Sequence, residues 1–286
     1  MLSFINNLNF THSFVKKIIF ASTFAFLASF LACAPEVKSQ SRSACGDVSG
    51  LSDVAFAQQN QGGCGITPEK YEIVLYEMGL CTGDSSPISG GSLSRTNCTA
   101  TFSNVSGQTV DLAGSASITL SKASSQAPAP NTYTWGYVVM ANTFGLKGSI
   151  ETASNTWRSS SDSTASSTST SNVEFTESLT TFSGSSGTCL SSGSASTNLG
   201  EMSAILAGSD LTEDTSCSNV SRLVGVFSPT SSYAISSSTS ALKITFDVAT
   251  NTSEGYIGAL TVMPSNTGGV ASFGSGPFRM EITTIE

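Results

Sequence analysis

Lys243-Ile-Thr-Phe-Asp-Val248 alternates polar and apolar residues along its whole length. Successive side chains of a β-strand point to opposite faces, so apolar residues at every second position gather on one face. The apolar residues in this stretch are β-branched or aromatic, which are the types that favour strands. The stretch therefore predicts a strand with one buried face and one face in solvent.

Other segments have the same character and are separated by clusters of Gly, Ser, Asn and Pro. Together with 240–248, they predict strands at 72–80, 99–103, 108–112, 116–121, 133–142, 173–179, 222–227, 256–263 and 279–285. Many short strands with polar turns between them are typical of a β-sandwich or a jelly roll. We expect an all-β, multi-stranded antiparallel fold with Ser/Thr-rich loops.

A helix competes with a strand at 67–79. Thr67-Pro68-Glu69-Lys70 has the cap residue and the first-turn proline of a helix start, and Tyr71, Val74 and Met78 share a helical face. The run Ile73-Val-Leu-Tyr76, however, is rich in residues that favour strands. We predict a strand here.

Two stretches are too polar to contribute to a core. Residues 159–172 are almost wholly Ser and Thr, and residues 183–196 are rich in Ser and Gly around Cys189. Segments that cannot bury apolar surface stay outside the packed structure, so we expect surface loops. Residues 66–286 form the predicted β domain. A subdivision of this domain, if there is one, is expected within the Ser-rich region 159–196.

The first residues have the composition of an export signal. Lys16-Lys17 precede an apolar stretch from Ile18 to Ala32 that ends in small residues. Basic residues, a short apolar core and small residues describe a signal peptide, whereas a membrane span takes about 20 apolar residues. We expect residues 1–32 to be removed and the mature protein to lie outside the cytoplasm; an uncleaved N-terminal anchor is the alternative.

Phe30-Leu31-Ala32-Cys33 resembles the lipobox of bacterial lipoproteins, in which the Cys becomes the acylated first residue of the mature protein. The sequence departs from the common pattern at Phe30, where Leu is usual. The resemblance covers only these residues and the preceding signal. It implies lipidation of Cys33, and residues 33–65 then hold a flexible tether and a disulfide-containing N-terminal segment.

The cysteines agree with export to an oxidising compartment. The chain has seven, and lipidation of Cys33 leaves an even number for disulfides. Pairing of sequence neighbours is the simplest arrangement and gives Cys45–Cys64, Cys81–Cys98 and Cys189–Cys217. A metal site is a weaker alternative, because no C-x-x-C pair occurs and no His lies near.

The composition is acidic and poor in charge. Lys and Arg number 12 and Asp and Glu number 20, a net charge of −8 that becomes about −10 when the signal removes Lys16 and Lys17. Nucleic acids and anionic lipid headgroups attract positive charge, so we expect neither as a partner. With 11% charged residues, solubility must come from Ser, Thr, Asn and Gly.

The mature chain has no histidine, because the only one, His12, lies in the signal. Ser-His-Asp and Cys-His catalysis and His-ligated metals are therefore excluded. Ser240-Ala-Leu-Lys243 fits S-x-x-K by spacing, but it opens a predicted strand and no K-T-G partner exists. A pair of carboxylates, as in glycosidases, is the catalytic alternative that remains.

Asp210, Glu213 and Asp214 form an acidic cluster that would suit calcium, because hard cations prefer oxygen ligands. The spacing does not match an EF-hand loop, so we prefer a solvated acidic turn. We expect no cofactor apart from this calcium alternative.

Tyr133, Trp135 and Tyr137 alternate along one predicted strand. Exposed rings of this kind stack on sugars, and buried ones pack a core. The apolar continuation Val138-Val-Met140 favours core packing, and a ligand-binding strip is the alternative.

Together these features predict a non-enzymatic, exported lipoprotein of the bacterial cell envelope, at the outer membrane or cell surface, that presents a β domain for binding, adhesion or assembly. Its partners would be the membrane through a lipid anchor and a glycan, a protein or further copies of itself. Three alternatives stay open: a carbohydrate-binding module, a filament or surface-layer subunit joined by strand addition, and a carboxylate-dependent glycoside-active enzyme.

Overall fold

The computed structural model describes residues 43–113, 128–182, 187–197, 200–239, 241–251 and 256–285. The signal, Cys33 and the strand expected at 116–121 lie outside these residues. The described part is an all-β fold, as the sequence predicts; its sheets are antiparallel except for one short parallel pair, and it contains one short helix. Within it, no helix combines the length and the apolar character that a membrane crossing requires.

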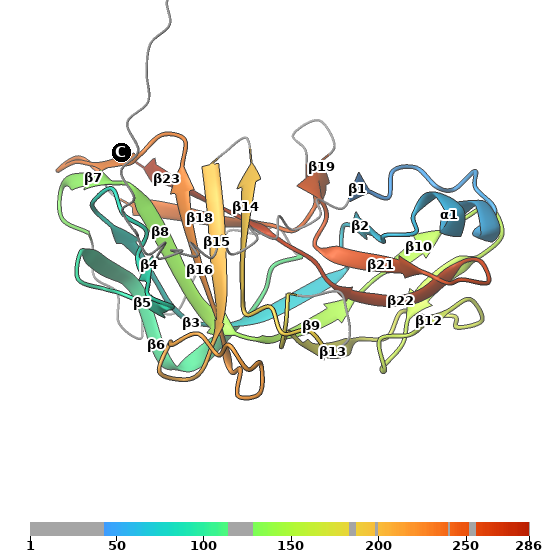
Figure 1. Ribbon diagram of the computed structural model, residues 1–286. Coiled ribbons are helices and arrows are strands. Elements are labelled where there is room, and N and C mark those ends of the chain that lie inside the picture. Colours follow the sequence, from blue (N-terminus) through green and yellow to red (C-terminus); the bar gives the residue numbers. More distant parts are fainter. Residues whose placement is uncertain are drawn as a thin grey trace, which may run out of the picture. The chain divides into compact units, whose positions relative to one another are not determined.

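An eight-stranded sheet forms the centre of the fold (Figure 1). Its strands follow the order β13-β9-β3-β8-β16-β15-β14, with β6 paired to β3, and every neighbouring pair is antiparallel. Their bounds are β3 Lys70–Cys81, β6 Cys98–Asp111, β8 Trp135–Ala141, β9 Thr143–Lys147, β13 Phe175–Ser178, β14 Ser192–Thr197, β15 Gly200–Ala207 and β16 Arg222–Pro229. Strands that precede and follow the Ser-rich region 159–196 thus share one sheet.

Smaller sheets surround this one. A four-stranded sheet has the order β1 (Ser43–Ala44), β2 (Cys64–Ile66), β21 (Leu260–Pro264) and β22 (Val270–Ser275), and a three-stranded one has β10 (Ser149–Glu151), β11 (Thr156–Ser159) and β12 (Ala165–Ser166). The two-stranded pairs are β4 (Ile88–Ser89) with β5 (Ser92–Leu93), β7 (Asn131–Tyr133) with β17 (Tyr233–Ile235), β18 (Ala241–Asp247) with β23 (Arg279–Ile285), and β19 (Thr250–Asn251) with β20 (Tyr256–Ile257).

The helix α1, Asp53–Gln59, was not predicted from the sequence. Ser52 caps its first turn, where the Ser52 hydroxyl accepts a hydrogen bond from the Ala55 amide at 3.3 Å. Phe56 is fully buried in the main core. With seven residues, the helix is too short to show the apolar repeat from which helices are recognised.

The central sheet buries side chains on both of its faces. In β8, Val138 and Met140 belong to the main hydrophobic core, whereas Tyr137 and Val139 belong to a second, smaller core on the other face. β16 alternates in the same way. This is the period-two pattern of a strand, and burial on both faces explains the continuous apolar run in β8.

β3 changes face part-way along its length. Ile73 and Leu75 point into the main core, and after a shift in register beside Tyr76 the even-numbered Met78 and Leu80 do so. An extra residue on one strand produces a bulge of this kind. Opposite Tyr76, the segment Asn104–Gly107 projects from β6, and Gly107 supplies the positive φ of 78° that this turn requires.

Two cap segments, 82–97 and 208–221, cover the second core. Each supplies a buried leucine, Leu93 and Leu211. The two segments also bond to each other, because the Glu213 amide donates to the Gly91 carbonyl at 2.7 Å. The second core is therefore covered by two cap segments that consist mainly of loops.

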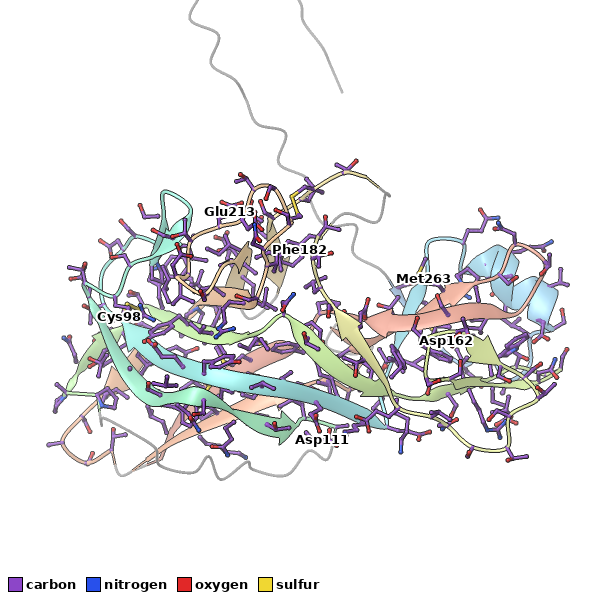
Figure 2. The ribbon with its side chains drawn as sticks, turned by 90° about the horizontal axis from the view of Figure 1, so that it is seen from below. Cys98, Asp111, Asp162, Phe182, Glu213 and Met263 are labelled. Carbon is purple, nitrogen blue, oxygen red and sulfur yellow. A yellow bond between two sulfur atoms is a disulfide. The ribbon has the colours of Figure 1, made fainter. Side chains whose placement is uncertain are left out.

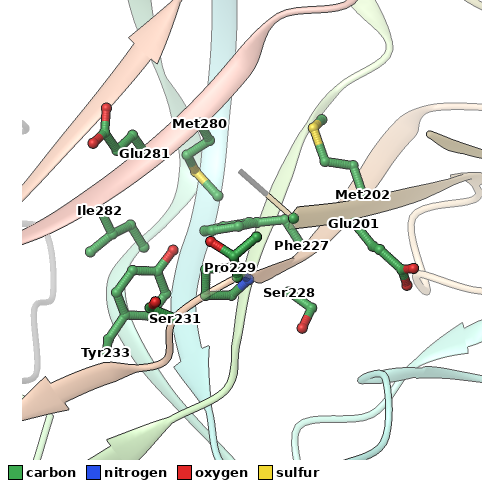
Figure 3. A pocket seen from close by; sticks show the side chains of 12 residues that line it. Glu201, Met202, Phe227, Ser228, Pro229, Ser231, Tyr233, Met280, Glu281 and Ile282 are labelled. Atoms are coloured by element: carbon green, nitrogen blue, oxygen red, sulfur yellow. The ribbon is translucent and has the colours of Figure 1, made fainter. Parts of the chain in front are cut away.

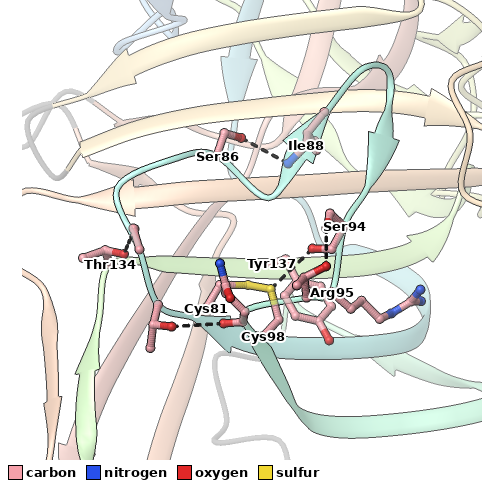
Figure 4. The surroundings of a disulfide bond; sticks show 12 residues. Cys81, Ser86, Ile88, Ser94, Arg95, Cys98, Thr134 and Tyr137 are labelled. Carbon is pink, nitrogen blue, oxygen red and sulfur yellow. Dashed lines mark hydrogen bonds between the residues drawn. A yellow bond between two sulfur atoms is a disulfide. The ribbon is translucent and has the colours of Figure 1, made fainter.

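Three disulfides join the pairs that the sequence predicts: Cys45–Cys64, Cys81–Cys98 and Cys189–Cys217. Cys81–Cys98 closes cap segment 82–97 at its base (Figure 4; Cys98 is also labelled in Figure 2). Cys189–Cys217 ties cap segment 208–221 to the chain before β14. Cys45–Cys64 links the neighbouring strands β1 and β2. Two bridges thus fasten the cover of the second core.

Several strand predictions need correction. The segments 99–103 and 108–112 belong to a single strand, β6, because the turn at Asn104–Gly107 interrupts its pairing without ending it. The segment 133–142 divides at Thr134 into β7 and β8, which pair with different partners. The segment 183–196 is not wholly loop: its end forms β14, where backbone pairing with β15 needs no apolar side chains.

Removal of one bridge measures its contribution. We expect Cys189→Ser with Cys217→Ser to lower the free energy of unfolding by about 3.5 kcal/mol in urea denaturation, because the bridge restricts a long loop of the unfolded chain. These cysteines are only partly buried, so serine adds little burial penalty. Thr215→Ser, an exposed substitution in the same cap segment, is the control and should change the free energy of unfolding little. Free thiols at these positions in the denatured, unreduced protein would contradict the pairing.

A charged network lies beneath cap segment 82–97. Arg95 donates from Nε to Glu77 Oε1 at 2.7 Å and from a terminal nitrogen to Oε2 at 2.8 Å, and the Tyr137 hydroxyl donates to Oε1 at 2.6 Å (Figure 4 shows Arg95 and Tyr137). The Glu77 side chain is 16% exposed. Burial opposes its ionisation, but the bonds from Arg95 and Tyr137 outweigh this and hold the pKa of Glu77 below its usual value.

We expect Arg95→Ala to lower the free energy of unfolding by about 1–3 kcal/mol, because Glu77 keeps its charge and loses its main partner. Adding Glu77→Gln should recover part of this loss. Because the folded pKa of Glu77 is lowered, its ionised form stabilises the fold above the unfolded pKa, and this contribution disappears as pH falls through the folded value. The advantage of wild type over Glu77→Gln should therefore shrink below about pH 4.

Candidate functional site

The acidic cluster does not converge on a common point. Asp210 accepts the Thr212 amide at 3.1 Å, Glu213 accepts the Ser191 hydroxyl at 2.6 Å, and Asp214 accepts the amide of Ser216 at 3.0 Å. Bonding to the Ser216 hydroxyl and then to the Asn219 amide holds the pKa of Asp214 below its usual value. Among the described residues, no group of three or more His, Cys, Asp or Glu side chains is placed to hold a metal ion.

The aromatic strip is not a continuous exposed face. Tyr133 lies in β7 and packs into the main core with 3% exposure, whereas Tyr137 lies in β8 and packs into the second core with 1% exposure. Trp135 is partly buried against the second core. The sequence predicts a single strand with the three rings on one face. Thr134 instead separates β7 from β8, and the three rings do not share a face. The burial of Tyr133 and Tyr137 agrees with core packing and leaves their rings little surface for stacking on a sugar.

A pocket of about 170 Å³ opens between β15, β16, β17 and β23 (Figure 3). Its lining combines apolar side chains, hydroxyl groups and two carboxylates: Gly200, Glu201, Met202, Phe227, Ser228, Pro229, Thr230, Ser231, Tyr233, Met280, Glu281 and Ile282. We take this pocket as the candidate site, since concave apolar sites with a few polar groups are where proteins bind small ligands.

The floor of the pocket is part of the main core. Met202 and Phe227 are opposite each other on β15 and β16, and Phe227 is only 8% exposed. Met280 and Ile282, from β23, are 8% and 7% exposed. The pocket is thus a place where the core reaches the surface, so its walls are held by the packing that holds the fold.

Two aromatic rings meet there at a steep angle. The ring centroids of Phe227 and Tyr233 are 6.2 Å apart, and their planes are inclined by 68°. Gly136 lies opposite Phe227 in the sheet, and a Cβ built on Gly136 would approach the Phe227 ring to 2.3 Å. Tyr233 is paired with Tyr133 across β17 and β7. Two residues of the motif 133–137, Tyr133 and Gly136, therefore contact or pair with residues that line the pocket.

Negative charge stands at the edge of the pocket. Glu201 and Glu281 are exposed, and in the view of Figure 3 their side chains lie on opposite sides of Phe227 and Met280. Burial, followed by the charge of Glu281, raises the pKa of Tyr233 above its usual value. Tyr233 therefore remains a neutral hydroxyl at physiological pH, and it can donate or accept a hydrogen bond.

The size of the pocket limits what it can take. Sites for drug-sized ligands have volumes of about 300–1,000 Å³, and one water occupies about 30 Å³ of liquid. A volume of about 170 Å³ suits one side chain or headgroup. The lining residues include no His, Cys, Lys or Arg, so the ionisable side chains of the pocket are the carboxylates of Glu201 and Glu281 and the phenol of Tyr233.

Comparison of the chain with protein-family models, with curated proteins and with solved structures gives no match.

Sequence analysis did not single out the pocket residues. β15 was not predicted, because the polar beginning of Gly200-Glu-Met-Ser hides the apolar Ile205-Leu-Ala207 at its end. Tyr233 lies in a strand of three residues, too short for a periodic signal.

Gly136→Ala tests the support of the pocket. The added methyl must displace the Phe227 ring, and we expect the free energy of unfolding to fall by about 1–3 kcal/mol, as in other overpacked cores. Gly193→Ala, on the edge strand β14 of the same sheet, meets its nearest atom at an ordinary 3.7 Å and should change stability little. Equal effects of the two substitutions in urea denaturation would contradict the close approach of Gly136 and Phe227.

Proposed function

We propose that this protein is an exported, lipid-anchored protein of the bacterial cell envelope that acts by binding and not by catalysis. The β domain presents the pocket of Glu201, Phe227, Tyr233 and Met280 to a partner, and the chain after Cys33 connects the domain to the membrane. Among the sequence features, the lipobox-like Phe30–Cys33 motif supports the anchor.

The single observation that carries the proposal is the set of three disulfides. Disulfides form and persist in oxidising compartments outside the cytoplasm and are rare in the cytosol. They account for six of the seven cysteines and leave Cys33, the residue that the lipobox resemblance assigns to acylation. A location outside the cytoplasm and an N-terminal cysteine that is not one of the six in the disulfides are both typical of a lipoprotein.

The pocket supports binding as the activity. Its twelve lining residues contribute hydroxyl and carboxylate groups but no imidazole, thiol or amine. Glu201 and Glu281 are exposed, whereas the acid of a glycosidase usually sits in apolar surroundings that raise its pKa. The volume also suits a single group and not an extended chain. The lining groups, the exposed carboxylates and the small volume are all consistent with a binding role.

Metabolic labelling with a palmitate analogue tests the anchor. We expect the label on the wild-type protein and in the membrane fraction, and we expect Cys33→Ser to abolish both, because a serine cannot form the thioether. Ser39→Ala, in the same stretch after the signal, is the matched control and should keep both. Labelling that persists in Cys33→Ser, or a purified protein that still begins at Met1, would contradict the proposal.

A further inference from the structure

We propose that the pocket between β15, β16, β17 and β23 binds an alkylammonium group, that is, a positively charged nitrogen carried on a short apolar stem. This inference names the ligand class of the binding role proposed above and rests on it. The aromatic and thioether floor would take the stem and the face of the cation, and the carboxylates at the edge would balance its charge.

The charge of the lining favours a cation. Glu201 and Glu281 bring two negative charges, and no lining residue is basic. The remaining polar groups are the hydroxyls of Ser228, Thr230, Ser231 and Tyr233, and each of these can accept a hydrogen bond from an ammonium group. An anionic ligand would meet two like charges and no positive partner there.

The apolar floor distinguishes an organic cation from a metal ion. Calcium and magnesium take oxygen ligands and retain water, whereas this floor consists of Met202, Phe227, Met280 and Ile282. The inclined rings of Phe227 and Tyr233, 6.2 Å apart, offer two walls of the kind that hold quaternary ammonium and lysine groups. Methionine sulfur is polarisable and adapts to such a group.

The lining also favours a cation over a sugar. Its hydroxyl groups could bond to a sugar, but a neutral sugar would leave the charges of Glu201 and Glu281 without a counter-charge from the ligand, whereas a cation supplies one. Its size admits the stem and head of a lysine side chain or the trimethylammonium group of choline. A protein side chain and a choline headgroup thus present the same alkylammonium chemistry, and titration with each of the two distinguishes them.

The test uses the mature chain with ¹³C-labelled methionine methyl groups. Met202 and Met280 line the pocket, whereas Met78, Met140 and Met263 do not, so the same spectrum contains the site and its internal control. Choline and Nα-acetyl-lysine amide are titrated. We expect saturable shifts confined to Met202 and Met280, with the tighter of the two ligands identifying a headgroup or a protein side chain as the source.

Neutral analogues of the same shape isolate the charge. We expect 3,3-dimethyl-1-butanol and Nα-acetyl-norleucine amide to bind at least about tenfold more weakly than choline and the lysine derivative. Glu201→Gln with Glu281→Gln should weaken the two cations by about tenfold and leave the neutral analogues unchanged. Glu151→Gln, an exposed carboxylate on β10, is the matched control and should have no effect.

Equal binding of charged and neutral analogues would overturn the inference, as would shifts spread over all methionines. Glucose that shifts Met202 and Met280 while the cations do not would also overturn it and would assign the pocket to a sugar. Failure of these titrations with intact palmitate labelling refutes only the ligand class. Binding of the cations with no labelling of Cys33 refutes only the lipid anchor.

Discussion

Burial on both faces of the central sheet is the constraint on which the rest of the structure depends. A strand such as β8 is apolar on both sides, so each side needs a cover. The main core obtains its cover from the smaller sheets. The second core obtains its cover from two polar cap segments that could not pack by themselves. Their attachment through Cys81–Cys98 and Cys189–Cys217 compensates for the apolar surface that they lack.

The same constraint explains how far the sequence could be interpreted. Strands with strong alternation or β-branched runs, such as 222–227 and 279–285, were predicted close to their bounds. Short strands such as β17 form because they pair with strands from distant parts of the chain; β17 pairs with β7. β14 is paired through its backbone although it is built of Ser, Gly, Ala and Thr. No local property of these segments indicates that pairing.

The candidate site was hidden from the sequence for a related reason. Met202, Phe227, Tyr233 and Met280 come from four strands, and only cross-strand register and the packing of β23 bring them together. The alternating aromatic residues 133–137 attract notice, but none of them lines the pocket: Tyr133 pairs with Tyr233, and Trp135 and Tyr137 pack in the second core. Cysteine pairing, in contrast, was accessible from the sequence, because each partner is the next cysteine along the chain.

That nearest-neighbour pairing has a consequence for biogenesis. The linked cysteines are separated by 17, 19 and 28 positions, so each ring encloses only a short piece of polypeptide. A chain that emerges from a translocation channel exposes both thiols of a pair before the next pair follows. If the chain is exported as proposed, oxidation in order of emergence gives the native connectivity, and each bridge can close before a late strand such as β23 arrives.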